Sequence, residues 1–365
     1  MKYYIIAGEA SGDLHASNLI KELKLLDRNA QFRCWGGDLM KEQGCELVKH
    51  YRELAFMGFT EVLMNLPTIL NNIDFCKKDL LQYKPDVLIL VDYPGFNLRI
   101  AEFAEKNRIK VFYYISPQIW AWKQSRIHKI KRVVDKMFVI LPFEKEFYQR
   151  FDCKVDFVGH PLLDAVADYS NLSDQLILDS DKPIIALLPG SRKQEISTML
   201  PIMLSMQKYY PDYQFIIAGA PSQNKEYYQP FISNADIKVI FNQTYQLLKK
   251  AHVALVTSGT ATLETALFGV PEVVCYKGGA ISFAIAKQLV KVKYISLVNL
   301  IMDKEIVKEL IQRELNESNL KLELDKLLDP ETRKKIKSDY AELILKLGGA
   351  GASKKTASLM IGYLK

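Results

Sequence analysis

Residues 258–264, SGTATLE, have the composition of a phosphate-binding loop. They follow the apolar run 253–256 and precede a helical pattern that stops near Gly269 and Pro271. A glycine at the start of a helix lets a ligand approach the backbone, where hydroxyls and helix N–H groups can donate to phosphate oxygens. Glu264, in the first turns of that helix, could accept hydrogen bonds from the two hydroxyls of a ribose, or it could complete a capping box. The segment alone is compatible with both interpretations.

A second loop of this kind, residues 187–192 (LLPGSR), ends another apolar run. Its arginine could bind a phosphate with the bidentate guanidinium fork, and the N–H groups around Gly190 would add donors. Taken alone, the same residues also describe a plain Pro-Gly turn with a solvated arginine. Two phosphate-type loops in one half of the chain favour a nucleotide diphosphate, whose expected ligands are Arg192, Ser258, Gly259 and Thr260.

The first half of the chain places carboxylates directly after apolar runs. Residues 8–13, GEASGD, contain Glu9 and Asp13, and His15 follows shortly after them. These are candidates for an acid, a base or a sugar-binding group, although an acidic residue in such a loop is more often a helix cap. Asp92 ends the run 88–91, at the point where an open parallel sheet binds its ligands. Asp92 is therefore the carboxylate most expected to do chemistry.

Two further segments suggest contacts with lipid or sugar. Dense apolar side chains between 56 and 70 predict a core helix or an exposed lip for acyl chains, and the lip would consist of Phe56, Met57, Phe59, Leu63 and Leu66. Trp120 and Trp122 could form the floor of a sugar site or pack in the core. The basic run that follows predicts a solvated helix face or attraction to anionic phosphate; it comprises Lys123, Arg126, Lys129, Lys131, Arg132 and Lys136.

Apolar runs alternate with helical patterns along the chain, and this alternation predicts the strands and helices that position the loops. Strands are expected at 3–7, 87–91 and 111–115, and then at 184–188, 215–218, 238–240, 253–256 and 272–275. Two such series predict an α/β protein with two doubly wound Rossmann-like domains that face a central cleft. We expect these domains at 1–165 and 166–345. A glycine hinge and a helix would follow at 346–365, packing on the first domain or on a second subunit.

The bulk properties agree with this organisation. A length of 365 residues suits two domains, and a net charge of +7 without a zinc-finger or helix-turn-helix pattern gives no indication of nucleic-acid binding. The 5 cysteines are scattered, which argues against a zinc site or a disulfide framework. Neither a signal peptide nor a membrane-spanning run is evident, so a cytoplasmic protein is expected.

A set of motifs, in order along nearly the whole chain, resembles the lipid-A-disaccharide synthase family. The motifs are GEASGD (8–13), KPD (84–86), DYPGFN (92–97), SPQIWAWK (116–123), FVGHPLLD (157–164), LPGSR (188–192), SGTATLE (258–264) and YISLVNLI (294–301). An ordered match of this extent is far more specific than any single loop.

The resemblance implies a GT-B glycosyltransferase of lipid A biosynthesis. Such an enzyme transfers 2,3-diacylglucosamine from UDP-2,3-diacylglucosamine to 2,3-diacylglucosamine 1-phosphate (lipid X), with inversion, giving the β-1,6 disaccharide phosphate and UDP. It would be a peripheral protein on the cytoplasmic face of the inner membrane of a Gram-negative bacterium, in agreement with an apolar lip and a basic run. A homodimer is a further expectation.

The resemblance also assigns roles to residues. UDP would be bound by Arg192, Ser258, Gly259, Thr260, Glu264, Asn299 and Gln312. Catalysis would depend on Asp92, Asp13 and Glu9, and the acceptor side would include Ser11, Gly12, His15, Asp86, Asn97 and Trp120. This chain departs from the family at Gly95, where many relatives carry a second acid that is a proposed base, so the expected base shifts to Asp92. The Leu-Pro-Asn of the family is Leu297-Val298-Asn299 here.

No metal or other cofactor is expected. Asp179-Ser180-Asp181 has D-x-D spacing but precedes an expected strand instead of following one. Arg192 and the helix start after Gly259 would instead stabilise the departing UDP. Two alternatives remain: another GT-B protein acting on UDP-N-acetylglucosamine, such as an epimerase or a peptidoglycan glycosyltransferase, and a nucleotide-sugar-binding protein without catalysis. An apolar lip would favour the synthase over an epimerase.

Overall fold

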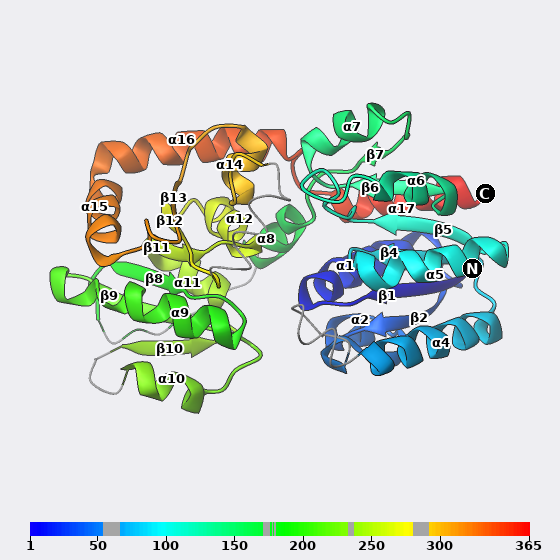
Figure 1. Cartoon of the computed structure of the whole chain (residues 1–365), viewed down its shortest axis with the longest axis horizontal. Helices are drawn as coiled ribbons and strands as arrows, with labels where there is room; N and C mark the ends of the chain where they lie inside the picture. The colour runs from blue at the N-terminus through cyan, green and yellow to red at the C-terminus, as the bar shows by residue number, and fades with distance from the viewer. Residues whose placement is uncertain (54–65, 171–175, 177, 179, 233–236, 280–291) are drawn as a thin grey trace. The chain divides into compact units, whose positions relative to one another are not determined.

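The chain folds into two compact units. The computed structural model describes residues 1–53, 66–170, 176, 178, 180–232, 237–279 and 292–365. Unit 1 comprises Met1–Asp164 with Leu347–Lys365, and unit 2 comprises Ala165–Lys346 (Figure 1). These boundaries fall next to those expected at 165 and 345. The expected lip residues Phe56, Met57, Phe59 and Leu63 lie outside the described residues.

Unit 1 is built on a 7-stranded parallel sheet with the order β3-β2-β1-β4-β5-β6-β7. Its central strand β4 has the sequence VLILV and is buried along its whole length, because helices cover both faces of a parallel sheet. Ala7 of β1 pairs with Val91 of β4, so the loops after these strands share one edge. The strands are β1 (Lys2–Ala7), β2 (Gln31–Gly36), β3 (Glu46–His50), β4 (Val87–Val91), β5 (Lys110–Tyr114), β6 (Lys136–Val139) and β7 (Asp156–Phe157).

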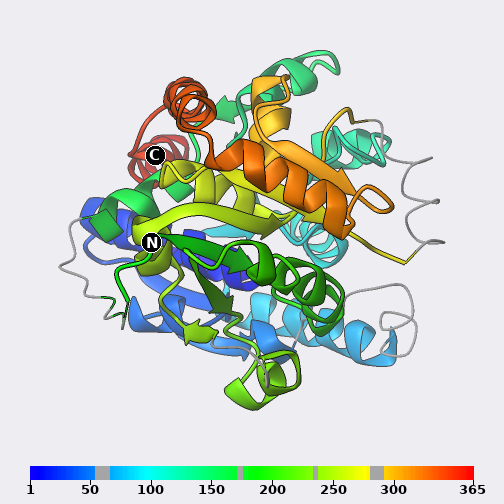
Figure 2. The same cartoon turned by 90° about the vertical axis from the view of Figure 1, so that its left-hand side faces the viewer.

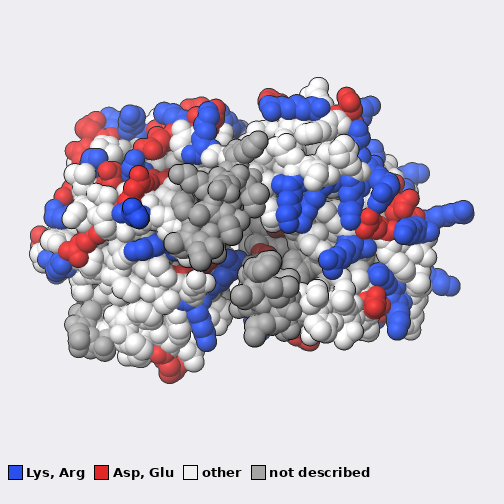
Figure 3. All heavy atoms as spheres, in the orientation of Figure 1, with Lys and Arg blue, Asp and Glu red and all other residues white. Residues whose placement is uncertain are grey.

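Two groups of helices pack on this sheet. One group contains α4 (Leu66–Tyr83), α5 (Pro94–Lys106) and α6 (Arg126–Val133), which contact one another in that order. In the other, α1 (Ala10–Leu26) contacts α2 (Asp38–Glu42) and α17 (Ala352–Leu364). The unit also has η1 (Tyr51–Glu53) and α7 (Pro142–Gln149), and α8 (Leu162–Ser170) runs across the boundary to unit 2. Lys and Arg side chains gather on the visible face of unit 1, over α5 and α6 (Figure 3).

Unit 2 repeats the design with a 6-stranded parallel sheet in the order β10-β9-β8-β11-β12-β13. Figure 2 shows this twisted sheet between its helices. The strands are β8 (Ile184–Leu188), β9 (Gln214–Gly219), β10 (Lys238–Phe241), β11 (Ala251–Thr257), β12 (Glu272–Tyr276) and β13 (Lys308–Ile311). The helices are α9 (Lys193–Leu204), η2 (Gln207–Tyr209), α10 (Lys225–Ile232), α11 (Thr244–Lys250), α12 (Thr260–Leu267), α14 (Leu297–Met302), α15 (Glu317–Leu328) and α16 (Pro330–Lys346).

Every strand expected from the apolar runs is present, with small differences at its ends, and the expectation of two doubly wound α/β units is confirmed. Strands β2, β3, β6, β7 and β13 were not expected, because they are short or interrupted by polar residues. All 5 cysteines are described and free. None of the helices in the described ranges is both long and apolar enough to cross a bilayer.

Candidate functional site

The carboxyl edge of the unit 1 sheet brings Glu9 and Asp92 together. Glu9 is the N-cap of α1 and comes just after β1, while Asp92 directly follows the adjacent strand β4. Burial, and then the charge of Glu9, raise the pKa of Asp92 to about 7. A carboxylate with this pKa can accept a proton effectively near neutral pH. The pair therefore has the electrostatic arrangement of a general base with an acidic neighbour.

The backbone that presents Asp92 is held in an uncommon conformation. Asp92 and Tyr93 have φ angles of 45° and 48°, in the left-handed region that residues other than glycine seldom adopt. Two fully buried side chains converge on the Asp92 carbonyl: the Tyr113 hydroxyl donates to it at 2.6 Å and Asn97 Nδ2 at 2.7 Å. A Cβ at Gly8 would lie 2.3 Å from Cγ of Tyr93, so this glycine is required by close approach. Sequence reasoning missed Tyr113, whose role depends on its strand lying beside β4.

Both carboxylate oxygens of Asp13 accept hydrogen bonds from backbone N–H groups at the start of α2. Its Oδ1 accepts hydrogen bonds from the N–H groups of Gly37 at 2.7 Å and Met40 at 3.1 Å, and its Oδ2 accepts one from Leu39 at 3.1 Å. The side chain is buried and caps the start of α2. This geometry favours the helix-cap alternative for Asp13 over a catalytic role.

Two expected acceptor-side residues of α1 are also buried. Gly12 packs against Ala7, since a Cβ at this glycine would lie 3.2 Å from that of Ala7. His15 meets His160 edge to face, with ring centroids 6.5 Å apart, and burial lowers the pKa of His15 to about 4. Ser11, in contrast, is exposed at the start of α1. Of these residues, only Ser11 has the exposure that contact with an acceptor requires.

Asp86 does not join the other carboxylates. It precedes β4 and accepts the N–H of Lys2 at 2.7 Å. Asp92 follows the same strand, so the two residues lie at opposite edges of the sheet. The structure therefore places Asp86 away from the candidate site.

Trp120 packs partly into the core of unit 1. Its ring meets Phe143 edge to face at a centroid distance of 4.9 Å. Close by, Ser116 Oγ donates to Glu144 Oε1 at 2.9 Å, and burial raises the pKa of Glu144 to about 7. This geometry agrees with the packing alternative for Trp120, and the buried Ser116–Glu144 bond anchors the loop that carries it.

In unit 2, β11 leads through Ser258 and Gly259 into the start of α12. The first N–H groups of a helix have no acceptor within the helix, so they attract an anion. Gly259 and Thr260 are exposed, as a ligand-binding loop requires. Ser258 instead braces the loop: its hydroxyl donates to the Ile295 carbonyl at 3.1 Å, and its N–H donates to the Cys275 carbonyl at 3.0 Å.

Glu264 does not form a capping box. With Gly259 as N-cap, the N3 position of α12 is Thr262, and Glu264 lies beyond it. Its Oε1 accepts a hydrogen bond from the Tyr245 hydroxyl at 2.8 Å, and burial raises its pKa. Tyr245, which belongs to α11, was not predicted. Its hydrogen bond holds the Glu264 carboxylate in one orientation. A role of Glu264 as the acceptor for the ribose hydroxyls stays a prediction.

Arg192 lies at the carboxyl end of β8, the neighbour of β11. Glu195 orders its loop, accepting the N–H groups of Ser191 at 3.1 Å and Arg192 at 3.3 Å with Oε2. The backbone donors expected for phosphate are therefore engaged by Glu195. The Arg192 side chain forms an ion pair with Glu195 at 3.1 Å and keeps 58% of its surface exposed. A guanidinium in this position remains accessible to an anionic ligand.

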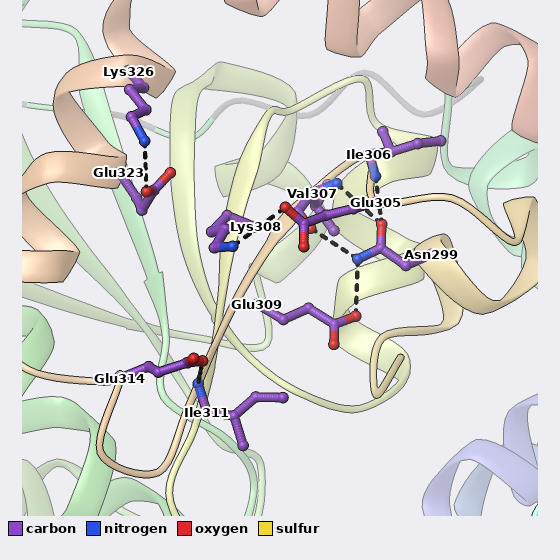
Figure 4. A network of polar contacts seen from close by, with 10 residues as sticks. All are labelled: Asn299, Glu305, Ile306, Val307, Lys308, Glu309, Ile311, Glu314, Glu323 and Lys326. Atoms are coloured by element: carbon purple, nitrogen blue, oxygen red, sulfur yellow. Dashed lines mark hydrogen bonds and ion pairs between the residues drawn. The ribbon is translucent and has the colours of Figure 1, made fainter. Parts of the chain in front are cut away.

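The last two expected UDP ligands differ. Asn299 is fully buried, and both ends of its amide are engaged within unit 2, as Figure 4 shows. Direct contact between Asn299 and a nucleotide would require these hydrogen bonds to break. Gln312 follows β13 and accepts the Gly278 N–H with Oε1 at 3.3 Å. Its Nε2 is buried and has no hydrogen-bond partner among the described residues.

Comparison with known families assigns the chain. The family model described as Lipid-A-disaccharide synthetase matches residues 3–361. The chain belongs to the lipid-A-disaccharide synthase family. Curated family members include the lipid-A-disaccharide synthase of Trichlorobacter lovleyi, 39% identical over 99% of this chain and 97% of the relative. That of Coxiella burnetii (strain Dugway 5J108-111) is 40% identical over 89% of this chain and 88% of the relative.

Solved structures with low sequence identity share the fold of this synthase-family chain. The UDP-GlcNAc 2-epimerase from Neisseria meningitidis, bound to UDP-GlcNAc, has a TM-score of 0.68 at 16% identity and covers 99% of this chain and 100% of its own. The glycotransferase of kitacinnamycin has a TM-score of 0.68 at 14% identity, covering 100% and 99%. These likenesses confirm the expected GT-B class and carry no information on substrate.

Proposed function

We propose that this chain transfers 2,3-diacylglucosamine from UDP-2,3-diacylglucosamine to lipid X, as the lipid-A-disaccharide synthase family does. The observation that carries the proposal is the family match over residues 3–361, which spans both units. The carboxyl edge of unit 1 supplies a carboxylate pair, and that of unit 2 supplies an accessible helix start and guanidinium. Deprotonation of an acceptor and stabilisation of a departing diphosphate require these two kinds of group.

In the proposed reaction, Asp92 removes the proton from the 6-hydroxyl of lipid X. The hydroxyl oxygen attacks the anomeric carbon opposite UDP, and the bond from that carbon to the diphosphate oxygen breaks through a transition state of oxocarbenium character. The bonding electrons leave with UDP, whose charge is stabilised by Arg192 and the N–H groups at Gly259 and Thr260. Asp92 then returns its proton to water.

The test is a thin-layer assay with lipid X and its UDP derivative. Formation of the disaccharide phosphate with release of UDP is the expected result. Binding of UDP without disaccharide would favour a nucleotide-sugar-binding protein, and interconversion of UDP-N-acetylglucosamine at its C2 centre would favour an epimerase.

The reaction is proposed to need no metal ion. The described residues contain no group of three or more His, Cys, Asp or Glu side chains placed to hold one. Asp179 of the D-x-D lies outside the described residues, so the expectation is tested in solution. Turnover should be unchanged in excess chelator, and a loss that Mg²⁺ restores would show the expectation to be wrong.

We also propose that the face formed by α4, α5 and α6 docks on the anionic cytoplasmic surface of the inner membrane. Leu66, Leu70 and Leu81 recur at helical spacing on α4 and are between 41% and 47% exposed. A groove of about 350 Å³ between α4 and α5 has apolar and charged walls, lined by Leu70, Ile73, Asp74, Lys77, Arg99, Glu102, Phe103 and Lys106. Apolar side chains among cations are suited to a phospholipid interface.

Trp122 supports the same docking face. The residue is 39% exposed, and Lys123 Nζ and Arg126 Cζ lie 4.4 Å and 5.5 Å from the centroid of its ring. A tryptophan between cations is typical of a headgroup contact. The homodimer, the other expected partner, remains a prediction.

Sedimentation with vesicles tests the docking. The wild-type chain should bind phosphatidylglycerol vesicles more tightly than phosphatidylcholine vesicles. The variant Lys123→Glu with Arg126→Glu should bind the anionic vesicles about tenfold or more weakly. Lys225→Glu with Lys335→Glu, which reverses the same number of charges at exposed positions of unit 2, is the matched control. Equal loss of binding in both variants would indicate that only net charge matters and that this face is not the docking surface.

A further inference from the structure

A buried carboxylate in unit 2 has a role that its position in the sequence does not reveal. Glu309 belongs to β13 and is 7% exposed. Its Oε1 accepts the Ser296 N–H at 3.0 Å, the Ser296 hydroxyl at 2.8 Å and Asn299 Nδ2 at 2.9 Å. Its Oε2 accepts the Ile295 N–H at 2.9 Å. Such a set of donors compensates the desolvation of a buried carboxylate.

Asn299 extends this network to the start of β13. Its Oδ1 accepts the Ile306 N–H at 2.8 Å and the Val307 N–H at 3.1 Å, while Nδ2 also donates to the Val307 carbonyl at 2.8 Å. Figure 4 shows Asn299 and Glu309 pointing toward each other across this turn. The two side chains together bind the start of α14 to β13.

One peptide group connects the network to the loop before α12. The N–H of the peptide between Ile295 and Ser296 donates to Glu309, and the carbonyl of the same peptide accepts the Ser258 hydroxyl at 3.1 Å. Because a peptide group is planar and rigid, its orientation at Glu309 sets the position of the acceptor for Ser258. Ser258 is followed directly by Gly259, the N-cap of α12.

We propose that Glu309 is a positioning residue of the nucleotide site, acting through the Ile295–Ser296 peptide and Ser258 on the start of α12. The inference rests on the proposed function, in which Gly259 and Thr260 bind the diphosphate of UDP. It also gives Asn299 an indirect role: this buried residue supports the site through Glu309 and not by contact with the nucleotide.

The neighbouring strand provides a matched control. Glu272 of β12 is fully buried, and neither of its carboxyl oxygens has a partner among the described residues. Burial, and then the charge of Glu309, hold the pKa of Glu272 well above its usual range. The surroundings therefore disfavour the ionised form of this side chain, and Glu272→Gln replaces the carboxyl group by an amide of the same shape.

The experiment is a double-mutant cycle on UDP affinity, measured by titration calorimetry on the full chain. Glu309→Gln places an amide NH₂ among donors, so we expect UDP to bind about tenfold more weakly. Ser258→Ala should also weaken UDP binding. If Glu309 acts through Ser258, the double variant should bind UDP no more weakly than Glu309→Gln alone. Glu272→Gln should bind UDP like the wild type. In turnover assays, Glu309→Gln should raise KM for the UDP-sugar and keep kcat at saturation.

Several outcomes would overturn the inference. If the losses of UDP affinity in the two single variants add in the double variant, Glu309 does not act through Ser258. The same conclusion follows if Ser258→Ala binds UDP like the wild type. Unchanged UDP affinity in Glu309→Gln would remove the role altogether. If Glu309→Gln does not fold, Ser296→Ala takes its place in the cycle, because it removes one donor to Glu309 and keeps the carboxylate. A wild-type chain that fails to bind UDP would instead refute the proposed function.

Discussion

At the scale of single residues, burial distinguishes carboxylates that look alike in the sequence. Glu9, Asp13, Asp86 and Asp92 all lie near the ends of apolar runs. Asp13 caps a helix and Asp86 lies at the far edge of the sheet, which leaves Asp92 beside Glu9. Of these carboxylates, Asp92 has a pKa raised to about 7, which suits a general base near neutral pH.

Replacing the proposed base should stop the chemical step without affecting the nucleotide. We expect Asp92→Asn to lower turnover about 10²-fold or more, since an amide cannot take the acceptor proton. UDP affinity should be unchanged, because the proposed nucleotide ligands belong to unit 2. The disaccharide assay and calorimetry measure the two effects separately. Turnover close to wild type would move the role to Glu9.

The neighbouring acid should tune the pH dependence of the same step. Asp92 must be ionised to act, so activity should rise as pH increases through about 7. Burial is the larger cause of this raised pKa and the charge of Glu9 the second. Glu9→Gln removes that charge, so the pKa of Asp92 falls and the acidic limb of kcat/KM should move to lower pH. Loss of activity at every pH would instead identify Glu9 as the base.

At the scale of elements, α17 completes unit 1 from the far end of the chain. It follows unit 2 in sequence and packs on α1. The Asp164 carboxylate accepts the N–H groups of Gly351, Ala352 and Ser353, which lie at the start of α17. One side chain thus caps the helix and attaches it to the segment where the chain leaves unit 1.

Removing this cap should loosen α17 selectively. We expect Asp164→Ala to lower the free energy of unfolding by about 1 kcal/mol and to accelerate amide hydrogen exchange in α17. Glu342→Ala is the control, because it removes an exposed i,i+4 ion pair with Lys346 on α16, which contributes little. Equal exchange in α17 of both variants would show that the cap does not hold the helix.

At the scale of the whole molecule, each unit has its own sheet and core, so unfolding need not be a single transition. In unit 2, the burial of one carboxyl group should make the free energy of unfolding depend on pH. Glu309 is surrounded by donors, whereas Glu272 on the adjacent strand has none among the described residues. Burial without donors disfavours the ionised form of an acid, and the pKa of Glu272 is raised.

The buried Glu272 should make the stability of the protein depend on pH. The folded-state pKa of Glu272 is raised, so above its ordinary pKa of about 4.3 the unfolded chain releases a proton that the folded chain retains. Raising the pH therefore favours unfolding through this group. We expect Glu272→Gln to be more stable than the wild type, by a margin that grows by up to about 1.4 kcal/mol per pH unit. Thermal unfolding between pH 5 and 8 measures the margin, and a constant margin would contradict the prediction.

The sequence by itself determined the two-unit α/β design and the loops that bear the site. Apolar runs such as VLILV form buried strands here, and the loops that follow these strands contain Asp92, Arg192, Gly259 and Thr260. Short strands with polar residues, such as β13 with Glu309, were not predicted from the sequence. Their burial depends on neighbouring strands and helices that lie far away along the chain. The family motifs likewise implied Asn299 as a ligand but not its hydrogen-bond partners.

Only the tertiary structure decided which polar groups remain available. Asp13 and Asn299 are occupied by donors and acceptors from other segments, and Tyr113 supports Asp92 from an adjacent strand. Hydrogen bonds and burial depend on residues far apart in sequence, whereas strand and loop formation depends mainly on near neighbours. The local sequence pattern therefore predicted the loops that form the site, and the tertiary structure determined which role each residue can have.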